Sequence, residues 1–92
     1  MIKTYADKET EKLYSTGHSV KFKSFERVAL RKLDMINAAI DVNTLRIPPG
    51  NHLEELAGDR AGQHSIRIND KWRICFRFEG CDAYDVEIVD YH

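Results

Sequence analysis

The clearest pattern of apolar and polar positions lies in the last third of the chain. From residue 72 to residue 78 every second side chain is apolar, with arginine or cysteine between them, which is the period of a strand with one buried face. Segments 61–68 and 83–89 indicate two further strands, and Asn69-Asp70 supplies a tight turn between the first two. The pattern predicts an antiparallel meander of three strands. On the side away from the apolar residues we expect Arg67, Arg73 and Arg77.

The third predicted strand runs directly into the polar end of the chain, Asp90-Tyr91-His92. Strict alternation puts Tyr91 on the side of the arginines and Asp90 on the packed side, while His92 lies beyond the strand pattern. The same alternation turns three side chains of this strand toward the core: Tyr84, Val86 and Ile88.

The first half of the chain has helical patterns. Residues 2–5 predict a brief strand, after which Asp7 caps a mostly polar helix at 8–16 that stops before a glycine. Ser24 opens a second helix at 25–40, which carries an apolar stripe at helical spacing. The stripe consists of Ala29, Leu33, Ile36 and Ile40.

The run Pro48-Pro49-Gly50 cannot continue a helix and marks the crossing from helices to strands, and residues 51–56 have no clear type. The order of elements is that of an α+β fold, with a short N-terminal strand and both helices on one face of an antiparallel meander. Since the chain has 92 residues and no linker, we expect one domain, 1–92.

Composition narrows the setting of the protein. The chain is 42% apolar, and no run approaches the roughly 18–20 apolar residues of a membrane span. Its first twelve residues lack the apolar stretch of a secretory signal. The two cysteines, Cys75 in a strand and Cys81 in a turn, do not resemble a disulfide framework. We therefore expect a cytoplasmic protein that has no membrane partner.

The net charge of -1 conceals a division along the chain. Acidic and basic residues balance up to residue 59, whereas residues 79–92 are acidic and contain no lysine or arginine. A basic set lies between them: Arg60, Arg67, Lys71, Arg73 and Arg77. Because a general nucleic-acid binder is usually basic overall, any RNA contact should be local and should depend on a scaffold that concentrates the substrate. A simpler alternative is that neighbouring strands neutralise one another.

The arginines and the polar end suit phosphodiester chemistry. Guanidinium groups bind phosphate oxygens through paired donors. Cleavage of RNA by its own 2′-hydroxyl needs a base, an acid and cations around the pentavalent phosphorus. His92 suits either proton role, because the reference pKa of histidine is about 6.5. Tyr91 can stack on a nucleobase or donate a proton, and Asp90 would orient His92 or tether the tail.

The histidines and cysteines do not indicate a metal site. No two histidines have the i, i+4 or HxH spacing of ligands, and the cysteines form no CxxC pair. His18 has the context of a loop residue and His64 that of a residue at the core edge. We expect no metal and no other cofactor.

The same residues carry a family resemblance. The segment GDRAGQHSIRINDKWRICFRF, followed by DAYDVEIVDYH, resembles the HigB toxins, the plasmid maintenance system killer branch of the RelE superfamily. The order of elements, the Pro-Pro-Gly crossing and the terminal VDYH match over the whole chain. This resemblance implies a RelE-like fold and a ribosome-dependent endoribonuclease that cuts mRNA in the A site of the 30S subunit and inhibits translation. It also implies a HigA-type helix-turn-helix antitoxin, through which alone the protein meets operator DNA.

Site residues can be carried over position by position. The resemblance implies catalytic roles for Arg73, Asp90, Tyr91 and His92 and phosphate contacts at Arg60 and Arg67. Charge alone adds Lys71 and Arg77 to the expected RNA-binding residues.

One position departs from a well-described branch of the family, which has a second histidine four residues before the glycine of the GDR turn. This chain has Glu54 there. Three assignments of the general base stay open: Glu54 with a raised pKa, His52 in its place, or His92 acting nearly alone while the ribosome supplies the geometry.

Two other functions fit the sequence. The first is a non-cleaving RelE-like module that occupies the ribosome or the antitoxin. The second is a small interaction domain unrelated to RNA. New transcript ends inside codons would distinguish cleavage from blockade, and ribosome binding that is insensitive to salt would favour the unrelated domain.

Overall fold

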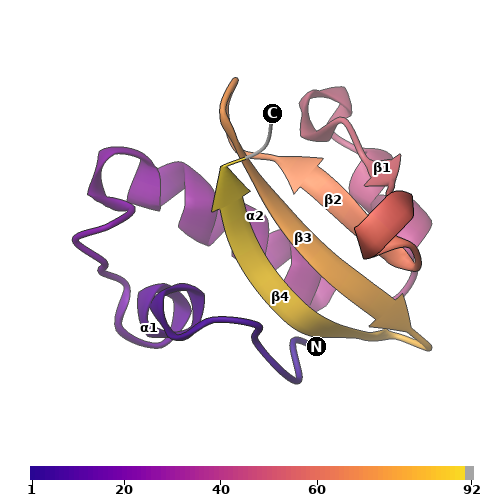
Figure 1. Ribbon diagram of the computed structural model, residues 1–92, viewed down its shortest axis with the longest axis horizontal. Helices are drawn as coiled ribbons and strands as arrows, with labels where there is room; N and C mark the ends of the chain where they lie inside the picture. The colour runs from indigo at the N-terminus through magenta and orange to yellow at the C-terminus, as the bar shows by residue number, and fades with distance from the viewer. Residues whose placement is uncertain (91–92) are drawn as a thin grey trace.

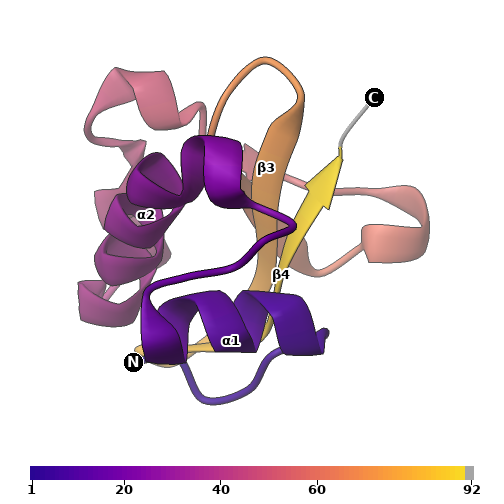
Figure 2. The same ribbon diagram turned by 90° about the vertical axis from the view of Figure 1, so that its left-hand side faces the viewer.

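Two helices packed against an antiparallel sheet make up residues 1–90, the part of the chain that this computed structural model describes (Figure 1). The helices are α1 (Lys8–Thr16) and α2 (Glu26–Ala38). The sheet has the order β1-β2-β3-β4, with strands Glu54–Glu55, Gln63–Arg67, Trp72–Glu79 and Asp82–Asp90. α2 lies on one side of β3 and β4, and α1 lies beside the edge strand β4 (Figure 2), where the hydroxyl of Thr10 accepts from the backbone N–H of Ile88; the side of the sheet away from α2 is called the open face below. No helix within residues 1–90 has the length and apolar character needed to cross a membrane.

The predicted α+β class and the three-strand meander are confirmed, with strand bounds that shift by one or two residues. Local chemistry explains α1 as predicted. The Asp7 side chain accepts a hydrogen bond from the backbone N–H of Thr10 at 3.2 Å, which satisfies one donor of the first turn. At the other end Gly17 has φ +83° and returns its N–H to the carbonyl of Leu13 at 2.8 Å, as a glycine C-cap does.

The entry into α2 differs from the prediction. Ser24 does not cap the helix; it lies in the 3-10 helix η1 (Lys23–Phe25), and Phe25 occupies the N-cap position. Aromatic packing accounts for this entry. The ring centroids of Phe22 and Phe25 lie 5.7 Å and 5.3 Å from that of Trp72, so the tight turn brings both rings onto the end of β3.

The predicted apolar stripe of α2 is right for Ala29, Leu33 and Ile36, which are fully buried, and wrong for Ile40, which is 76% exposed. The helix ends at Ala38 and the backbone becomes extended at the next residue. The helical period therefore stops before Ile40.

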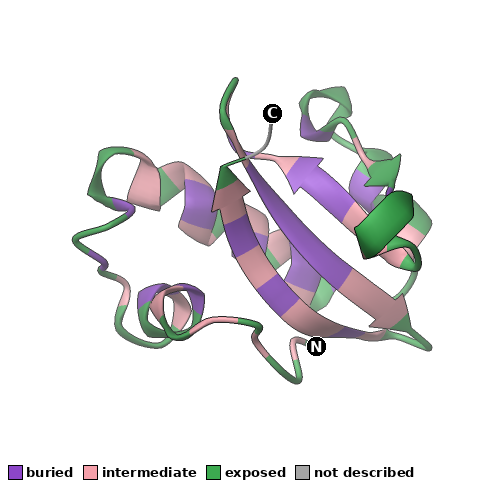
Figure 3. Cartoon of the chain, viewed as in Figure 1, coloured by how far each residue is buried: buried purple, intermediate pink, exposed green. Residues whose placement is uncertain are grey.

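The core lies between the helices and the inner face of the sheet. Leu33 and Ile36 of α2 share one fully buried cluster with Ile74, Phe76 and Val86 of the sheet. Each such side chain contributes about 1.5–3 kcal/mol on burial. Figure 3 shows the buried residues along the middle of β3 and on α2, and exposed residues in the turns.

A β-bulge changes the facing of residues in β4. Cys75 pairs with Glu87 and Arg77 pairs with Tyr84, so β4 holds one more residue than β3 over this stretch. Asp85 has φ +55°, a left-handed conformation that aspartate tolerates better than most residues. The prediction that Tyr84 faces the core is therefore wrong: Tyr84 lies on the open face beside Arg77, and the fully buried Ala83 takes the inward position.

The predicted N-terminal strand runs beside β4 and forms two isolated bridges to it, not a continuous strand. Ile2 and Tyr5 form parallel bridges to Ala83 and Val86 along the outer edge of β4. Between them the N–H of Asp85, the bulged residue, donates to the hydroxyl of Thr4 at 2.8 Å. The bulge thus interrupts the ladder that a regular strand would need.

The crossing from α2 to the sheet, unassigned at 51–56 in the sequence, contains the 3-10 helices η2 (Val42–Arg46) and η3 (Pro49–Asn51) and then β1. β1 is an edge strand of two exposed residues that pair with Ser65 and His64 of β2. So short a polar strand has no alternation to detect. The 3-10 helix η4 (Gly58–Arg60) then leads into β2.

Candidate active site

Strand register sets which side chains of the open face are neighbours. Directly opposite residues of antiparallel strands share a face. One row runs across the sheet from Glu54 through Ser65 and Cys75 to Glu87, and the next row contains Arg67, Arg73 and Val89. The face predicted for Arg67, Arg73 and Arg77 is confirmed.

Arg73 occupies the centre of the open face, but it is buried, with 8% exposure. Its Nε donates to Ser65 Oγ at 2.8 Å. Its Nη2 donates to the carbonyl oxygen of His52 at 2.5 Å and to that of Ser65 at 3.4 Å. The guanidinium is therefore held against β2 and the end of the crossing segment instead of extending into solvent.

Arg67 lies directly opposite Arg73. Two like charges at opposite positions repel each other, and their partners draw the two guanidinium groups apart. Arg67 donates from Nε to the carbonyl of Asn69 at 3.1 Å and forms an ion pair with Asp70 in the hairpin turn. The two guanidinium groups nevertheless belong to one row of the open face.

Arg60 reaches over the sheet from η4. Its Nη2 lies 3.2 Å from Glu87 Oε1 on β4, and its Nη1 donates to Gln63 at 3.1 Å. Lys71 Nζ likewise lies 3.5 Å from the carboxylate of Asp90. These contacts match the simpler alternative, in which neighbouring segments neutralise one another.

Arg77 lies toward the β3–β4 hairpin, in the row of Gln63 and Tyr84, and the structure does not bring it together with Arg73. It forms ion pairs with Glu79 and, at 3.4 Å, with Asp85. Its guanidinium stacks over the Tyr84 ring at 4.7 Å from the centroid. Two carboxylates around one cation make this end of the face a poor phosphate site, so the expected RNA contact of Arg77 gains no support from its surroundings.

Glu54 and His52 lie at the edge of the open face. Glu54 is exposed on β1, directly opposite Ser65. His52 is exposed as well and has φ +45°. It contacts Arg73 through its backbone carbonyl. Both candidate bases therefore lie next to the residues that hold Arg73.

Asp90 is the last residue of β4. Asp90 pairs with Trp72 and so shares its packed side, as predicted. Tyr91 and His92, which carry the expected stacking and proton-transfer roles, lie outside the described residues.

Cys75 lies in the middle of the open face and is fully buried. Burial raises the pKa of its thiol, and the charge of Arg60 opposes that rise only in part. A thiol that stays protonated is a weak nucleophile. Cys75 lies within β3 and Cys81 lies exposed in the hairpin turn, as predicted.

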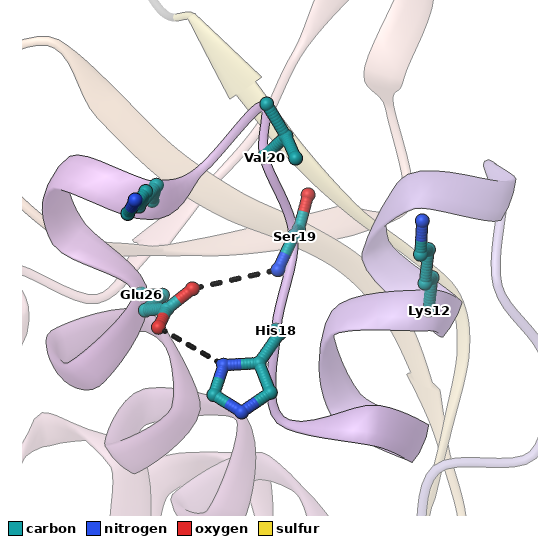
Figure 4. Close-up of a pocket in the computed structure, with 6 residues that line it drawn as sticks. Lys12, His18, Ser19, Val20 and Glu26 are labelled. Atoms are coloured by element: carbon teal, nitrogen blue, oxygen red, sulfur yellow. Dashed lines mark hydrogen bonds and ion pairs between the residues drawn. The ribbon is translucent and has the colours of Figure 1, made fainter.

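A pocket of about 280 Å³ lies on the other side of the molecule, between α1 and the start of α2 (Figure 4). Its polar contacts are internal: His18 Nδ1 lies 3.3 Å from Glu26, whose other oxygen accepts from the backbone N–H of Ser19 at 3.4 Å. The pocket is lined by Lys12, His18, Ser19, Val20, Lys23 and Glu26. None of these is a predicted site residue, so the pocket and the candidate site are separate.

Comparison with known proteins decides the family. A family model described as RelE-like toxin of the type II toxin-antitoxin system HigB matches residues 3–92. The chain is 38% identical over 80 residues to Toxin HigB-1 of Vibrio cholerae, covering 85% of this chain and 84% of that protein. The chain belongs to the HigB-like toxin family. A second relative, Endoribonuclease HigB of Proteus vulgaris, is 34% identical over 94 residues and matches along the full length of both chains.

Solved structures show the same fold as this HigB-like toxin. A chain of the YoeB–YefM toxin–antitoxin complex from Staphylococcus aureus has a TM-score of 0.62 at 17% identity and covers 100% of this chain and 98% of its own. A single-residue mutant of YafQ from E. coli has a TM-score of 0.59 at 16% identity, covering 98% of this chain and 91% of its own. The predicted RelE-like fold is confirmed. As a toxin of a type II pair, the protein has an antitoxin partner.

In this HigB-like toxin the predicted site divides into two groups. Arg67, Arg73 and Glu54 lie on neighbouring rows of the open face, with Arg60 reaching over the sheet from η4. Arg77 lies apart from them, toward the β3–β4 hairpin. Sequence reasoning missed Ser65, which binds Arg73, and Tyr84, which the bulge turns outward. Neither has a strong sequence signal, although an aspartate after Tyr84 is compatible with a bulge.

Proposed function

We propose that this HigB-like toxin is an endoribonuclease that cleaves mRNA in the ribosomal A site, in the cytoplasm, and thereby inhibits translation. Membership of the family and the full-length match to an endoribonuclease support the nuclease activity. The proposal goes beyond this support in three respects: cleavage depends on the ribosome, it takes place in the A site, and the protein acts in the cytoplasm.

One observation carries the chemistry: two arginines, Arg67 and Arg73, lie directly opposite each other on the sheet face that the helices leave uncovered, and Glu54 lies on the adjoining edge strand. In the proposed reaction the 2′-hydroxyl of the RNA attacks the neighbouring phosphorus. A base accepts the hydroxyl proton, Arg73 stabilises the charge that develops on the phosphate oxygens, and an acid protonates the leaving 5′-oxygen. The products are a 2′,3′-cyclic phosphate and a free 5′-hydroxyl.

Four residues are candidate proton carriers in this proposal: Glu54, His52, Tyr91 and His92. Glu54 or His52 serves as the base, or His92 acts in that role itself, and His92 with Tyr91 supplies the acid. Asp90 supports the tail. Arg60, Arg67 and Lys71 bind flanking phosphates by exchanging a carboxylate partner for a phosphate oxygen.

The exchange of partners explains why a scaffold is needed. Arg60, Arg67 and Lys71 each contact a carboxylate in the described structure, and the whole chain has a net charge of -1. Binding of free RNA therefore gains little from counterion release. A ribosome that already holds the mRNA in place supplies the proximity that the toxin lacks.

The antitoxin partner is proposed to be a HigA-type helix-turn-helix protein, which alone contacts operator DNA. We further propose that residues 1–92 act as one domain, in line with the family match over residues 3–92. An open reading frame for such an antitoxin beside the toxin gene is the expected arrangement.

The test combines induction of the toxin with mapping of 5′ transcript ends. Wild-type protein should produce new ends inside codons of translated messages, and His92→Gln or deletion of His92 should abolish both these ends and growth inhibition. Full activity in the His92 variants would remove His92 from the mechanism. Ribosome binding without any new ends would favour the non-cleaving module instead.

A further inference from the structure

We propose that Ser65 and the backbone carbonyl of His52 form a clamp that positions Arg73 for catalysis, so that Ser65 is a positioning residue of this toxin. The inference rests on the proposed function of Arg73 and adds the residues through which that function is prepared. Neither the serine nor the carbonyl is among the groups expected to touch RNA.

The clamp is built from neighbouring strands. Ser65 is opposite Cys75, whereas Arg73 is opposite Arg67, so the Arg73 side chain must lean along the sheet to reach Ser65. Long side chains can span such a diagonal across paired strands. The hydroxyl of Ser65 is fully buried and accepts from Nε at 2.8 Å. The second point, the carbonyl of His52, accepts from Nη2 at 2.5 Å. Two points on different nitrogens fix the plane of the guanidinium.

The second point of the clamp is anchored in the helical layer. Asn51, the residue before His52, is fully buried. Its Nδ2 donates to the carbonyl of Leu45 at 3.0 Å, and its Oδ1 accepts from Lys32 of α2. The backbone at His52 has φ +45°, a conformation that a non-glycine residue keeps only where the surrounding contacts require it. Asn51 thus links α2, through Lys32, to the His52 carbonyl that holds Arg73.

Such a clamp matters because an arginine side chain loses much rotamer freedom when it is fixed, and a stabilising donor works best when it is already in place. The clamp engages Nε and Nη2 of Arg73. Because Ser65 acts through Arg73 and does not touch the substrate, its removal should lower kcat and leave KM unchanged.

Single-turnover and steady-state cleavage by purified toxin on ribosomes programmed with a defined mRNA test this prediction. Ser65→Ala should lower kcat roughly 5- to 50-fold, as expected for a charged donor that loses its buried partner. Its KM for the programmed ribosome should stay within about 2-fold. Ser65→Thr keeps the hydroxyl and should restore most of kcat.

Ser19→Ala is the matched control. Ser19 is also buried, and its hydroxyl also makes one hydrogen bond of 2.8 Å, to Glu9, but in the helical half of the molecule. A loss of thermal stability shared by the two alanine variants is therefore not a sign of the clamp. Only Ser65→Ala should lower kcat.

Two further measurements show whether Ser65 acts through Arg73. In the Arg73→Lys background, adding Ser65→Ala should change kcat by less than about 2-fold, because the partner is already gone. The Arg73 Nε–H resonance in the NMR spectrum, which needs no ribosome, should move toward the position of solvent-exposed arginines in Ser65→Ala and stay in place in Ser19→Ala.

The outcomes separate the two proposals. Wild-type protein that does not cleave on programmed ribosomes overturns the proposed function, and the resonance still decides the clamp. If wild type cleaves and Ser65→Ala keeps full kcat, or leaves the resonance unmoved, the clamp is overturned while the cleavage function stands. If the double variant lowers kcat by the product of the two single-variant factors, the claim that Ser65 acts through Arg73 is likewise overturned.

Discussion

The two faces of β3 are both buried, but different contacts bury them. On the inner face Ile74 and Phe76 are fully buried against apolar side chains of the helical layer. On the open face Cys75 and Arg73 are also buried, at 0% and 8% exposure, although neither α1 nor α2 lies over that face. Polar contacts of Arg73 and the reach of Arg60 across to Glu87 close that face. Burial on one side of the strand comes from the apolar core, and burial on the other side comes from polar contacts of Arg73 and Arg60.

The largest effect should come from a substitution on the apolar inner face of β3. Phe76→Ala leaves a cavity beneath the sheet and should lower the free energy of unfolding by about 3–5 kcal/mol, as measured by denaturant titration. Val20→Ala is a suitable control, because Val20 is 88% exposed and its loss should change stability by less than about 0.5 kcal/mol. An equal loss in both variants would contradict the assigned core.

The next effect concerns the edge of the open face and the identity of the base. Glu54→Gln should lower single-turnover cleavage about 100-fold if Glu54 accepts the 2′-hydroxyl proton, with the free energy of unfolding unchanged because Glu54 is exposed. Glu55→Gln is the control, since Glu55 pairs with His64 and so faces the other side of β1. Loss of cleavage in both variants would show that the strand and not the carboxylate matters.

His52→Asn completes that test, because asparagine tolerates the left-handed backbone and keeps the carbonyl that holds Arg73. The variant should cleave normally if only the backbone of His52 contributes. A loss as large as that of Glu54→Gln would instead assign the base to the His52 imidazole.

A smaller change should follow from releasing Arg60. The Arg60–Glu87 pair is about one third exposed at each partner, so it contributes only about 0.2–1 kcal/mol. Glu87→Gln frees the guanidinium for phosphate and should strengthen binding of a short single-stranded RNA by roughly 2- to 5-fold. The binding should also become more sensitive to salt. Glu55→Gln removes the same charge from the other face, and an equal gain there would attribute the effect to net charge alone.

The smallest effect lies in the helical layer. Burial and the hydrogen bond to Asp34 raise the pKa of Tyr14 from 10.0 to about 12. The raised pKa stabilises the fold fully below pH 10, and this contribution is lost as the pH rises toward about 12. The difference in unfolding free energy between wild type and Tyr14→Phe should therefore shrink over that interval in denaturant titrations. Parallel curves would contradict the proposed role of the phenol.

The fold could be predicted because its signals are local. Alternation from Trp72 to Phe78, the Asp7 cap and the Gly17 stop each depend on a few adjacent residues, and each is confirmed. The end of α2 and the bulge at Asp85 could not be predicted in this way. Both depend on where the chain meets another segment, and a single inserted residue reverses the facing of Tyr84.

The sequence predicts which residues lie at the candidate site better than it predicts the contacts between them. The alternation of side chains along each strand is enough to put Arg67 and Arg73 on one face. It does not show that Arg73 is buried, or that Ser65 and His52 hold it, because those contacts join segments that are distant in sequence and depend on the length of one side chain. The ion pairs of Arg60 and Lys71 agree with the alternative in which neighbouring strands neutralise one another's charge, which the sequence left open.

Because Arg67 and Arg73 are directly opposite each other, the stability of the fold should depend on whether an anion is bound at the open face. Arg67 and Arg73 are like charges at directly opposite positions, and an anion bound at this face would oppose their mutual repulsion. A ligand that binds only the folded state stabilises it by mass action. The toxin should therefore resist unfolding and proteolysis better when it is engaged with its target than when it is free, so that an unoccupied molecule is the more readily degraded.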